Sequence, residues 1–200
     1  MEYKPRKNRP RPISAKKLDA AFAPLALEIG QLNRAWNRLH ENLGKIFAAI
    51  LNRNVATVPL AVWYSVTNDR SQRLMLSAAS KAFFAFDTAT HPKAKDDIKW
   101  LLKECDALAG QRNTAIHAPL ILTRQDGSKD IKIASEYFFG NPLAASLKDK
   151  NLFDEMLWYR ARAEILQNHA LSIWMHFGQR ESWPEKPLMP TPTRGQTRRK

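Results

Sequence analysis

The sequence predicts an all-α protein, an up-and-down helical bundle with a small β-hairpin inserted before the last long helix. Three observations lead to this expectation. Near both ends of the chain, apolar residues recur every three or four positions over long stretches, which is the spacing of one helix face. Between them, the Asp-Gly pair at 126–127 separates two short apolar runs, a pattern typical of a hairpin. With 200 residues, 44% of them hydrophobic, the chain is long enough for one domain with a sizeable core.

The first long helix is indicated by one unbroken apolar stripe. Its members are Leu18, Phe22, Leu25, Ile29, Leu32, Trp36, Leu39, Leu43, Ile46 and Ile50. Proline is favoured in the first turn of a helix, so the regular helix is predicted from Pro24 to Leu51, with Asp19 available to cap a short turn before it. A helix of this length spans about 40 Å. It therefore needs a bundle or a second subunit to cover its stripe.

The next segment, residues 52–66, is predicted either as a short helix beginning at Thr57-Val58-Pro59 or as extended chain. A helix start is then expected at Thr67-Asn68-Asp69, because capping and acidic side chains stabilise the positive end of a helix. Four apolar residues are expected on its buried face: Leu74, Ala78, Ala82 and Phe86.

A third helix is predicted to begin near Lys93 and to bury an apolar stripe of its own. Its members are Ile98, Leu101, Cys105 and Leu108. The helix should end by His117, because Pro119 disfavours helical geometry at Ala118.

The hairpin is expected at about 119–140, with strands at 120–123 and 130–134 around the turn Gln125-Asp126-Gly127-Ser128. Asn141-Pro142 predicts a further turn. The last helix is predicted to begin at the N-cap Asn151 and to stop near Gly178. Its stripe is Leu152, Met156, Tyr159, Ala163, Leu166, Ala170, Ile173 and Phe177.

The net charge of +13 is concentrated at the two ends of the chain. Residues 1–17 carry seven Lys/Arg and one Glu, and residues 184–200 carry five and one, which leaves +3 for the residues between. The predicted organisation is a disordered basic tail (1–17), a helical domain (18–178) and a Pro-rich basic tail (179–200). The tails either strengthen contact with RNA in a salt-dependent way or only solubilise the chain. The stretch from Trp183 to Pro192 is expected either to act as a docking peptide or to wrap the bundle.

The sequence lacks the features of membrane and secreted proteins. A membrane helix needs ~18–20 apolar residues, and the longest uncharged run, Val55 to Val66, is shorter and contains Pro59. The basic N-terminus has no apolar stretch after it, so no secretory signal is expected. The single Cys105 excludes an internal disulfide and a multi-cysteine metal site. We therefore expect a cytoplasmic protein with no membrane partner.

Several common catalytic motifs are also missing. The chain has no clustered glycines, no His-Glu-x-x-His helix and no Gly-x-Ser-x-Gly turn, so neither a metal nor a cofactor is expected. His169 and His176 lie two helical turns apart on the last helix. A lone helix would hold them too far apart to share a metal ion, so both are expected to be satisfied or exposed.

One segment carries a candidate site: Gln111-Arg112-Asn113-Thr114-Ala115-Ile116-His117. It resembles the signature of the HEPN superfamily (higher eukaryote and prokaryote nucleotide-binding domains). In that signature an arginine, usually followed by a polar residue, precedes a histidine by four to six intervening positions. Arg112, Asn113 and His117 match the four-residue form, and with the expected bundle the resemblance extends over residues 18–178.

Two other pairs share the bare spacing, Arg34 with His40 and Arg162 with His169. In both, the arginine is followed by alanine, and neither pair lies where a helix meets a proline.

The resemblance implies a metal-independent endoribonuclease, of the kind that acts as a toxin or a defence effector. His117 would accept the proton of an RNA 2′-hydroxyl or donate one to the leaving 5′-oxygen. Arg112 would hold the scissile phosphate and stabilise its transition-state charge. Asn113 would orient the histidine or the phosphate. The products would be a 2′,3′-cyclic phosphate and a free 5′-hydroxyl, and DNA would not be cut.

Helix geometry bears on how such a site is assembled. Side chains five positions apart on a helix point about 140° from each other, so Arg112 and His117 of one chain do not converge while both stay helical. Either the helix unwinds near Ile116, or two copies of the motif face each other across a dimer. The resemblance implies the second arrangement, a homodimer with a composite site, with RNA as substrate and an antitoxin or regulatory protein as a partner.

A second interpretation is a non-catalytic HEPN-like helical dimer that serves as a binding or regulatory module. Arg112 would then pair with an acidic residue, and His117 would satisfy the last carbonyls of its helix. Asp69 is expected either to cap its own helix or to be that acidic residue. Five tryptophans are expected in the core rather than stacked on bases: Trp36, Trp63, Trp100, Trp158 and Trp174.

Overall fold

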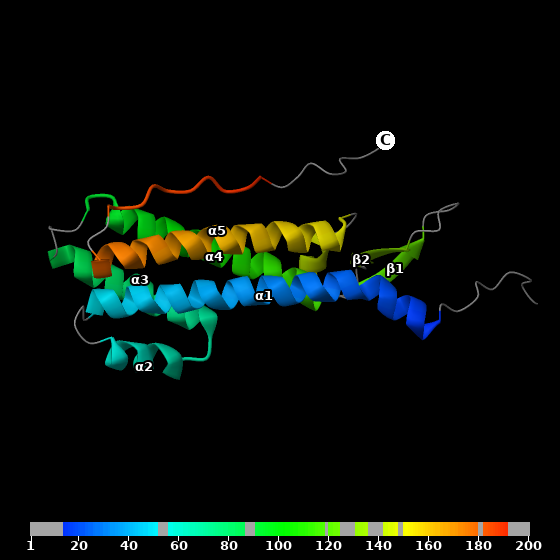
Figure 1. Ribbon diagram of the computed structural model, residues 1–200, viewed down its shortest axis with the longest axis horizontal. Coiled ribbons are helices and arrows are strands. Elements are labelled where there is room, and N and C mark those ends of the chain that lie inside the picture. Colours follow the sequence, from blue (N-terminus) through cyan, green and yellow to red (C-terminus); the bar gives the residue numbers. More distant parts are fainter. Residues whose placement is uncertain are drawn as a thin grey trace, which may run out of the picture.

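Helices dominate the part of the chain that the computed structural model describes, residues 14–51, 56–86, 91–118, 120–124, 131–135, 142–147, 150–179 and 182–191. There are five α-helices in these residues: α1 (Ala15–Leu51), α2 (Thr57–Ser65), α3 (Asp69–Phe86), α4 (Ala94–His117) and α5 (Leu152–Gln179). Figure 1 shows the long helices running back and forth along the long axis of the molecule.

Four of these helices close a ring around the core. α1 packs against α5 and α3, and α4 packs against the same two helices, while α2 packs on the outer side of α1. The predicted all-α helical bundle is therefore confirmed.

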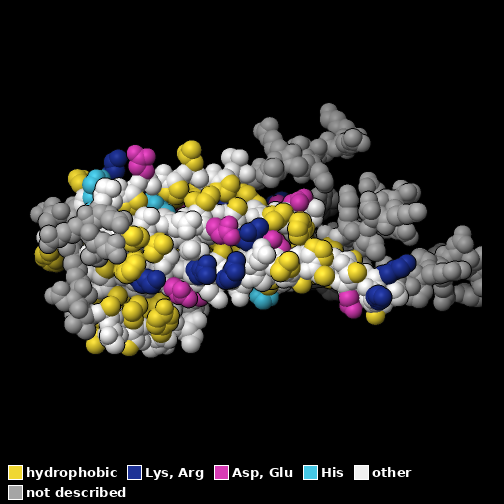
Figure 2. Space-filling model, viewed as in Figure 1, with side chains coloured by type: hydrophobic (Ala, Val, Ile, Leu, Met, Phe, Trp, Pro, Cys, Tyr) yellow, Lys and Arg dark blue, Asp and Glu magenta, His cyan; other side chains and the backbone are white. Residues whose placement is uncertain are grey.

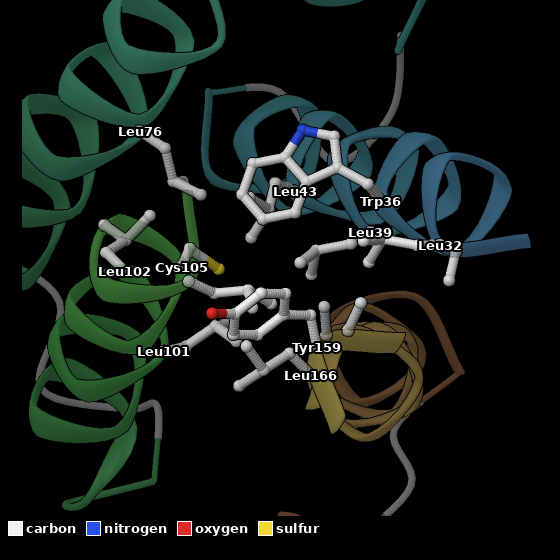
Figure 3. Close-up of a cluster of buried hydrophobic side chains, with 14 of the residues drawn as sticks. Leu32, Trp36, Leu39, Leu43, Leu76, Leu101, Leu102, Cys105, Tyr159 and Leu166 are labelled. Atoms are coloured by element: carbon white, nitrogen blue, oxygen red, sulfur yellow. The ribbon is translucent and has the colours of Figure 1, made fainter. Parts of the chain in front are cut away.

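The apolar stripes of α1, α4 and α5 form most of the core. The α1 stripe is buried or half-buried from Phe22 onward, whereas Leu18 stays exposed. All four predicted residues of α4 and all eight of α5 are buried. Figure 3 shows side chains from α1, α3, α4 and α5 meeting in one cluster, among them Cys105 and Tyr159. Cys105 is fully buried and unpaired, and burial raises the pKa of its thiol to about 12.

α1 begins at Ala15, nine residues before the predicted start at Pro24. Pro24 lies inside the helix, where it has no N–H to donate to the carbonyl of Ala20. Ala20 and Pro24 are both exposed, so the missing bond falls on the surface of the helix rather than in the core.

Residues 57–65 take the helical alternative as α2, with Pro59 in the first turn. The next helix begins at Asp69, as predicted, and Asn68 provides the cap: its side-chain oxygen accepts hydrogen bonds from the backbone N–H of Arg70 (2.9 Å) and Ser71 (3.1 Å). The cap satisfies two of the backbone donors that the first turn leaves free.

The predicted buried face of α3 is wrong. Leu74 is 61% exposed, Phe86 is 90% exposed, and Ala78 and Ala82 between them are exposed too. The face turned inward instead carries Gln72, Arg73, Leu76 and Ser80. Gln72 and Arg73 lie on it because they bond to groups of α1, α2 and α4, as described below.

α4 ends at His117, as predicted. Two short strands follow, β1 (Leu120–Arg124) and β2 (Ile131–Ser135), paired antiparallel with Leu122 opposite Ile133. The expected turn at 125–128 and the turn at Asn141 lie outside the described residues. The 3₁₀ turn η1 (Pro142–Leu147) then places Leu147 in the core.

α5 begins at its predicted cap, because the Asn151 side-chain oxygen accepts a hydrogen bond from the N–H of Phe153 (3.1 Å). It continues to Gln179, one residue past Gly178.

Residues 182–191 wrap the bundle, which resolves one of the open alternatives. Asp97 of α4 accepts hydrogen bonds from the Trp183 indole (2.8 Å) and the Lys186 ammonium (2.9 Å), and the Trp158 indole donates to the carbonyl of Pro190 (3.0 Å). Figure 1 shows the segment running along the upper side of the bundle. Part of the predicted C-terminal tail is therefore anchored to α4 and α5.

Exposed hydrophobic side chains gather on α2. Val58 is 67% exposed and Val62 is 47% exposed, and Figure 2 shows hydrophobic side chains over this helix on the face in view.

Within the described residues, no helix is both long enough and apolar enough to cross a membrane.

Candidate functional site

Arg112, Asn113 and His117 lie in the last two turns of α4. Arg112 is half-buried, whereas Asn113 and His117 are exposed. The helix stays intact through His117, and Ala118 then takes the extended conformation (φ −69°, ψ 137°) that a following proline favours. The chain does not unwind near Ile116, so the first of the two alternatives for a shared site is excluded.

The guanidinium of Arg112 is held by amide oxygens and an indole ring. Nη1 donates to Oδ1 of Asn113 and Nη2 donates to Oδ1 of Asn33 on α1, both at 2.9 Å. The guanidinium carbon lies 5.3 Å from the centre of the Trp36 ring, within the range of a cation–π interaction. These contacts from two helices fix the direction of the guanidinium.

No carboxylate touches this guanidinium among the described residues, which distinguishes Arg112 from the other buried or half-buried arginines. Three other arginines of the bundle each form an ion pair with a carboxylate: Arg73 with Asp106, Arg160 with Glu28, and Arg162 with Glu104. Burial lowers the pKa of Arg112, and the nearby charge of Asp69 opposes that change. The direct hydrogen bonds of Arg112 go to neutral amide oxygens, and Asp69 acts on its charge without touching it, so the guanidinium can still attract an anion.

Asp69 holds the Trp36 ring in place. Its Oδ2 accepts a 2.7 Å hydrogen bond from the Trp36 indole nitrogen, which Figure 3 shows on the edge of the ring away from Leu101 and Tyr159. The residue was expected to cap its helix or to pair with Arg112, and its hydrogen bond goes to Trp36 instead. Asp69 thereby fixes the ring on which Arg112 rests.

A buried polar row continues from Trp36 into the bundle. The guanidinium carbon of Arg73 lies 5.7 Å from the same ring, and its Nη1 lies 3.2 Å from Nε2 of His40. His40 is buried, and its Nδ1 lies 3.2 Å from Oε1 of Gln72. Burial lowers the pKa of His40.

The two competing Arg–His pairs have other surroundings. Arg34 is exposed while His40 is buried. Arg162 is buried and donates to Gln111 (2.7 Å) and Glu104 (2.8 Å). Neither pair presents an arginine with a free charge to solvent beside an exposed histidine.

His169 lies in the core against the ring of Trp100, and its Nε2 has no hydrogen-bond partner in the described part of the chain. It is thus neither satisfied nor exposed, and burial lowers its pKa. Among the described residues, no three side chains from His, Cys, Asp and Glu are placed to hold a metal ion.

Sequence reasoning missed the contribution of α1 to this site. Trp36 belongs to the apolar stripe and was assigned only to the core, where its ring does lie. Asn33 is an exposed polar residue with no motif around it, so no signal pointed to it. The spacing of three between Asn33 and Trp36 places both on one face of α1, and this becomes informative only once α4 is known to pack there.

The comparisons add no relative. No protein-family model matches the chain, and no curated protein or solved structure matches it either.

Proposed function

We propose that the protein is a HEPN-type, metal-independent endoribonuclease that acts as a homodimer, in a toxin or defence setting. The proposal rests above all on the guanidinium of Arg112, fixed by two amide oxygens and an indole and not neutralised by any contacting carboxylate among the described residues. A phosphate is the natural partner of such a group, because the planar fork of donors and the full charge match its oxygens.

His117 supplies the proton transfers. It is exposed at the end of α4, and an imidazole exchanges protons readily near neutral pH. One histidine accepts the proton of the 2′-hydroxyl, whose oxygen then attacks phosphorus. A second histidine donates a proton to the 5′-oxygen as its bond to phosphorus breaks. The RNA is left with a 2′,3′-cyclic phosphate and a 5′-hydroxyl.

Helix geometry supports a composite dimer. With α4 intact, Arg112 and His117 of one chain point about 140° apart, so the partner's His117 is better placed to act on a phosphate held at Arg112. An exposed apolar residue, Leu74 of α3, is available for the contact between copies. It directly follows Arg73 in the chain, and the guanidinium groups of Arg73 and Arg112 both lie against the ring of Trp36.

Cleavage of a single-stranded RNA in excess EDTA tests the proposal. We expect the wild-type protein to leave cyclic phosphate ends, and His117→Ala to lower the rate at least about a hundredfold, the usual contribution of a general acid or base. Arg112→Lys keeps the charge but loses the fork, and should also be strongly impaired. Arg34→Ala, an exposed arginine from a competing pair, is the matched control and should cleave normally.

Two results would end the proposal: an inert wild-type protein, or equal cleavage by His117→Ala. A substrate with a single 2′-deoxy position should resist cleavage at that position, because the nucleophile is missing there. In cells, overexpression should arrest growth and Arg112→Ala should relieve the arrest.

A non-catalytic HEPN-like dimer that binds a partner is the second candidate. It is favoured by the same contacts read differently: both terminal nitrogens of Arg112 already have protein partners. In that case Arg112→Ala lowers the thermal midpoint of unfolding, and neither Arg112→Ala nor His117→Ala alters the RNA cleavage pattern.

A further inference from the structure

We propose that a cavity between α3 and α4 binds a small organic anion with an apolar body. The cavity has a volume of about 230 Å³. Its lining combines the apolar side chains of Ile98 and Leu102 with the serines Ser77 and Ser80. This site is separate from the Arg112 cluster and does not depend on the ribonuclease proposal.

Ser80 is the first of two independent observations that point to a ligand. The residue is only 6% exposed, and its hydroxyl has no hydrogen-bond partner among the described residues. Buried hydroxyls are nearly always bonded, so an orphan on a cavity wall calls for a missing partner. An anionic oxygen in the cavity would accept its proton after a rotation about χ1.

Charge is the second observation. Three exposed lysines line the cavity, Lys81 from α3 and Lys95 and Lys99 from α4. None of them forms an ion pair within the described residues. Among the described residues, no acidic side chain lines the cavity, and Asp96 and Asp97 line a separate hollow beside Trp183. The positive charge at this site is therefore unbalanced.

Size and lining together define the ligand. An apolar cavity of about 150 Å³ holds one benzene ring, so a volume of about 230 Å³ accommodates a single ring with one anionic substituent. The apolar part of the lining, Ile98 and Leu102, suits an apolar body. The lysines suit a carboxylate or a phosphate, and both head groups share the chemistry of the proposal.

Calorimetric titration of the full chain tests the site, with phenyl phosphate and benzoate as the two probes. At least one of the two probes should bind, and the tighter of the two identifies the preferred head group. Inorganic phosphate, which lacks the apolar body, and benzyl alcohol, which lacks the charge, should bind at least about tenfold more weakly, because each loses one half of the interactions.

Variants locate the binding. The double variant Lys95→Gln/Lys99→Gln should weaken the better probe about tenfold or more. Ser80→Ala should weaken it about tenfold by removing a hydrogen bond to a charged group. The same Ser80→Ala change should leave the thermal midpoint unchanged or higher, because the hydroxyl has no partner to lose. Lys103→Gln, an exposed lysine of α4 outside the cavity lining, is the matched control and should change affinity by less than about twofold.

Four outcomes would overturn the proposal. They are binding of neither probe at millimolar concentration, equally tight binding of inorganic phosphate, an equal loss in Lys103→Gln, and displacement of phenyl phosphate by single-stranded RNA. The last would assign the lysines to a nucleic-acid backbone.

Discussion

The side-chain amide of Gln72 determines the protonation of His40. Its Nε2 donates to the backbone carbonyls of Trp63 (3.1 Å) and Val66 (2.9 Å), so its Oε1 must be the atom that faces Nδ1 of His40. Nδ1 therefore carries the proton, which leaves the lone pair of Nε2 to accept from the guanidinium of Arg73. A second proton on His40 would point at that guanidinium and break the contact.

This arrangement predicts a pH-dependent stability. Burial lowers the pKa of His40, and the charges of Arg73 and Arg112 add to the effect, whereas the charge of Asp69 and the hydrogen bond with Gln72 oppose it. The unfolded chain therefore takes up the proton first. The contribution of His40 to stability is complete above its unfolded pKa of about 6.5 and is lost as pH falls below that value. Urea unfolding from about pH 8 to about pH 5 should show a smaller decline in His40→Gln than in wild type. Identical declines would contradict the assignment, since His169 titrates in both proteins.

Gly44 is required where α1 meets α2. A Cβ at this position would lie 2.8 Å from Nε1 of the buried Trp63, which is closer than packed atoms come. Gly44→Ala should therefore lower the free energy of unfolding by about 1–3 kcal/mol, the usual cost of overpacking. Gly30, on an open part of the same helix, has nothing within 4 Å of such a Cβ. Gly30→Ala should raise the free energy of unfolding by ~0.5–1 kcal/mol. Chemical denaturation of both variants measures the difference, and a neutral Gly44→Ala would show that α2 shifts freely.

Among the helices, α3 is unusual because its inner face carries Gln72, Arg73 and Ser80 beside Leu76. The sequence predicted the buried faces of α4 and α5 because their apolar residues lie on one stripe each. In α3 the apolar residues at 74, 78, 82 and 86 form an equally regular row, yet that row faces solvent. Gln72 and Arg73 displace it from the interior because their partners lie on α1, α2 and α4. Such partners, distant in sequence, are invisible to periodicity.

The exposed row of α3 predicts where two copies meet. Leu74 is 61% exposed, so Leu74→Glu should leave the folded monomer intact while placing a charge in the proposed contact. We expect sedimentation to show a shift from dimer to monomer and RNA cleavage to fall with it. Leu27→Glu on α1, at a residue that is 64% exposed, is the control and should remain dimeric. A dimer that survives Leu74→Glu would place the interface elsewhere.

At the scale of the whole molecule, residues 182–191 hold α4 and α5 together from outside. Burial alone would raise the pKa of Asp97, but the hydrogen bonds from Trp183 and Lys186 and the charge of Lys186 outweigh it and lower that pKa. Trp183 also packs against the rings of His91 and Phe177. The segment thus contacts both the residues just before α4 and the last turns of α5.

Trp183→Ala should lower the free energy of unfolding by about 2–3 kcal/mol, somewhat less than a fully buried tryptophan would cost. Limited proteolysis should then cut within 182–191, whereas the wild-type protein should resist cleavage there. Leu188→Ala in the same segment, at a residue that is 94% exposed, should change stability by less than about 0.5 kcal/mol. Equal resistance of Trp183→Ala and wild type would mean that the indole does not anchor the segment.

The sequence predicted most of the fold and only one side of the candidate site. Stripes and caps are local patterns, so the helices ending in Leu51 and His117 and the cap at Asn151 could be located. The start of α1 could not, because proline is a first-turn signal and an exposed turn tolerates it inside a helix. At the site, the motif indicated Arg112, whereas Asn33 and Asp69 reach it only through the packing of α1 against its neighbours.

The chemistry of Cys105 makes the proposed assembly measurable. It is the only cysteine of the chain, and a thiol that ionises only near pH 12 in a sealed core hardly reacts with maleimides or methanethiosulfonates at neutral pH. A cysteine introduced on the surface of α4, as in Lys103→Cys, would then take up a nitroxide label alone. The spin–spin separation between two labelled copies would report directly how far apart the two motif-bearing helices sit.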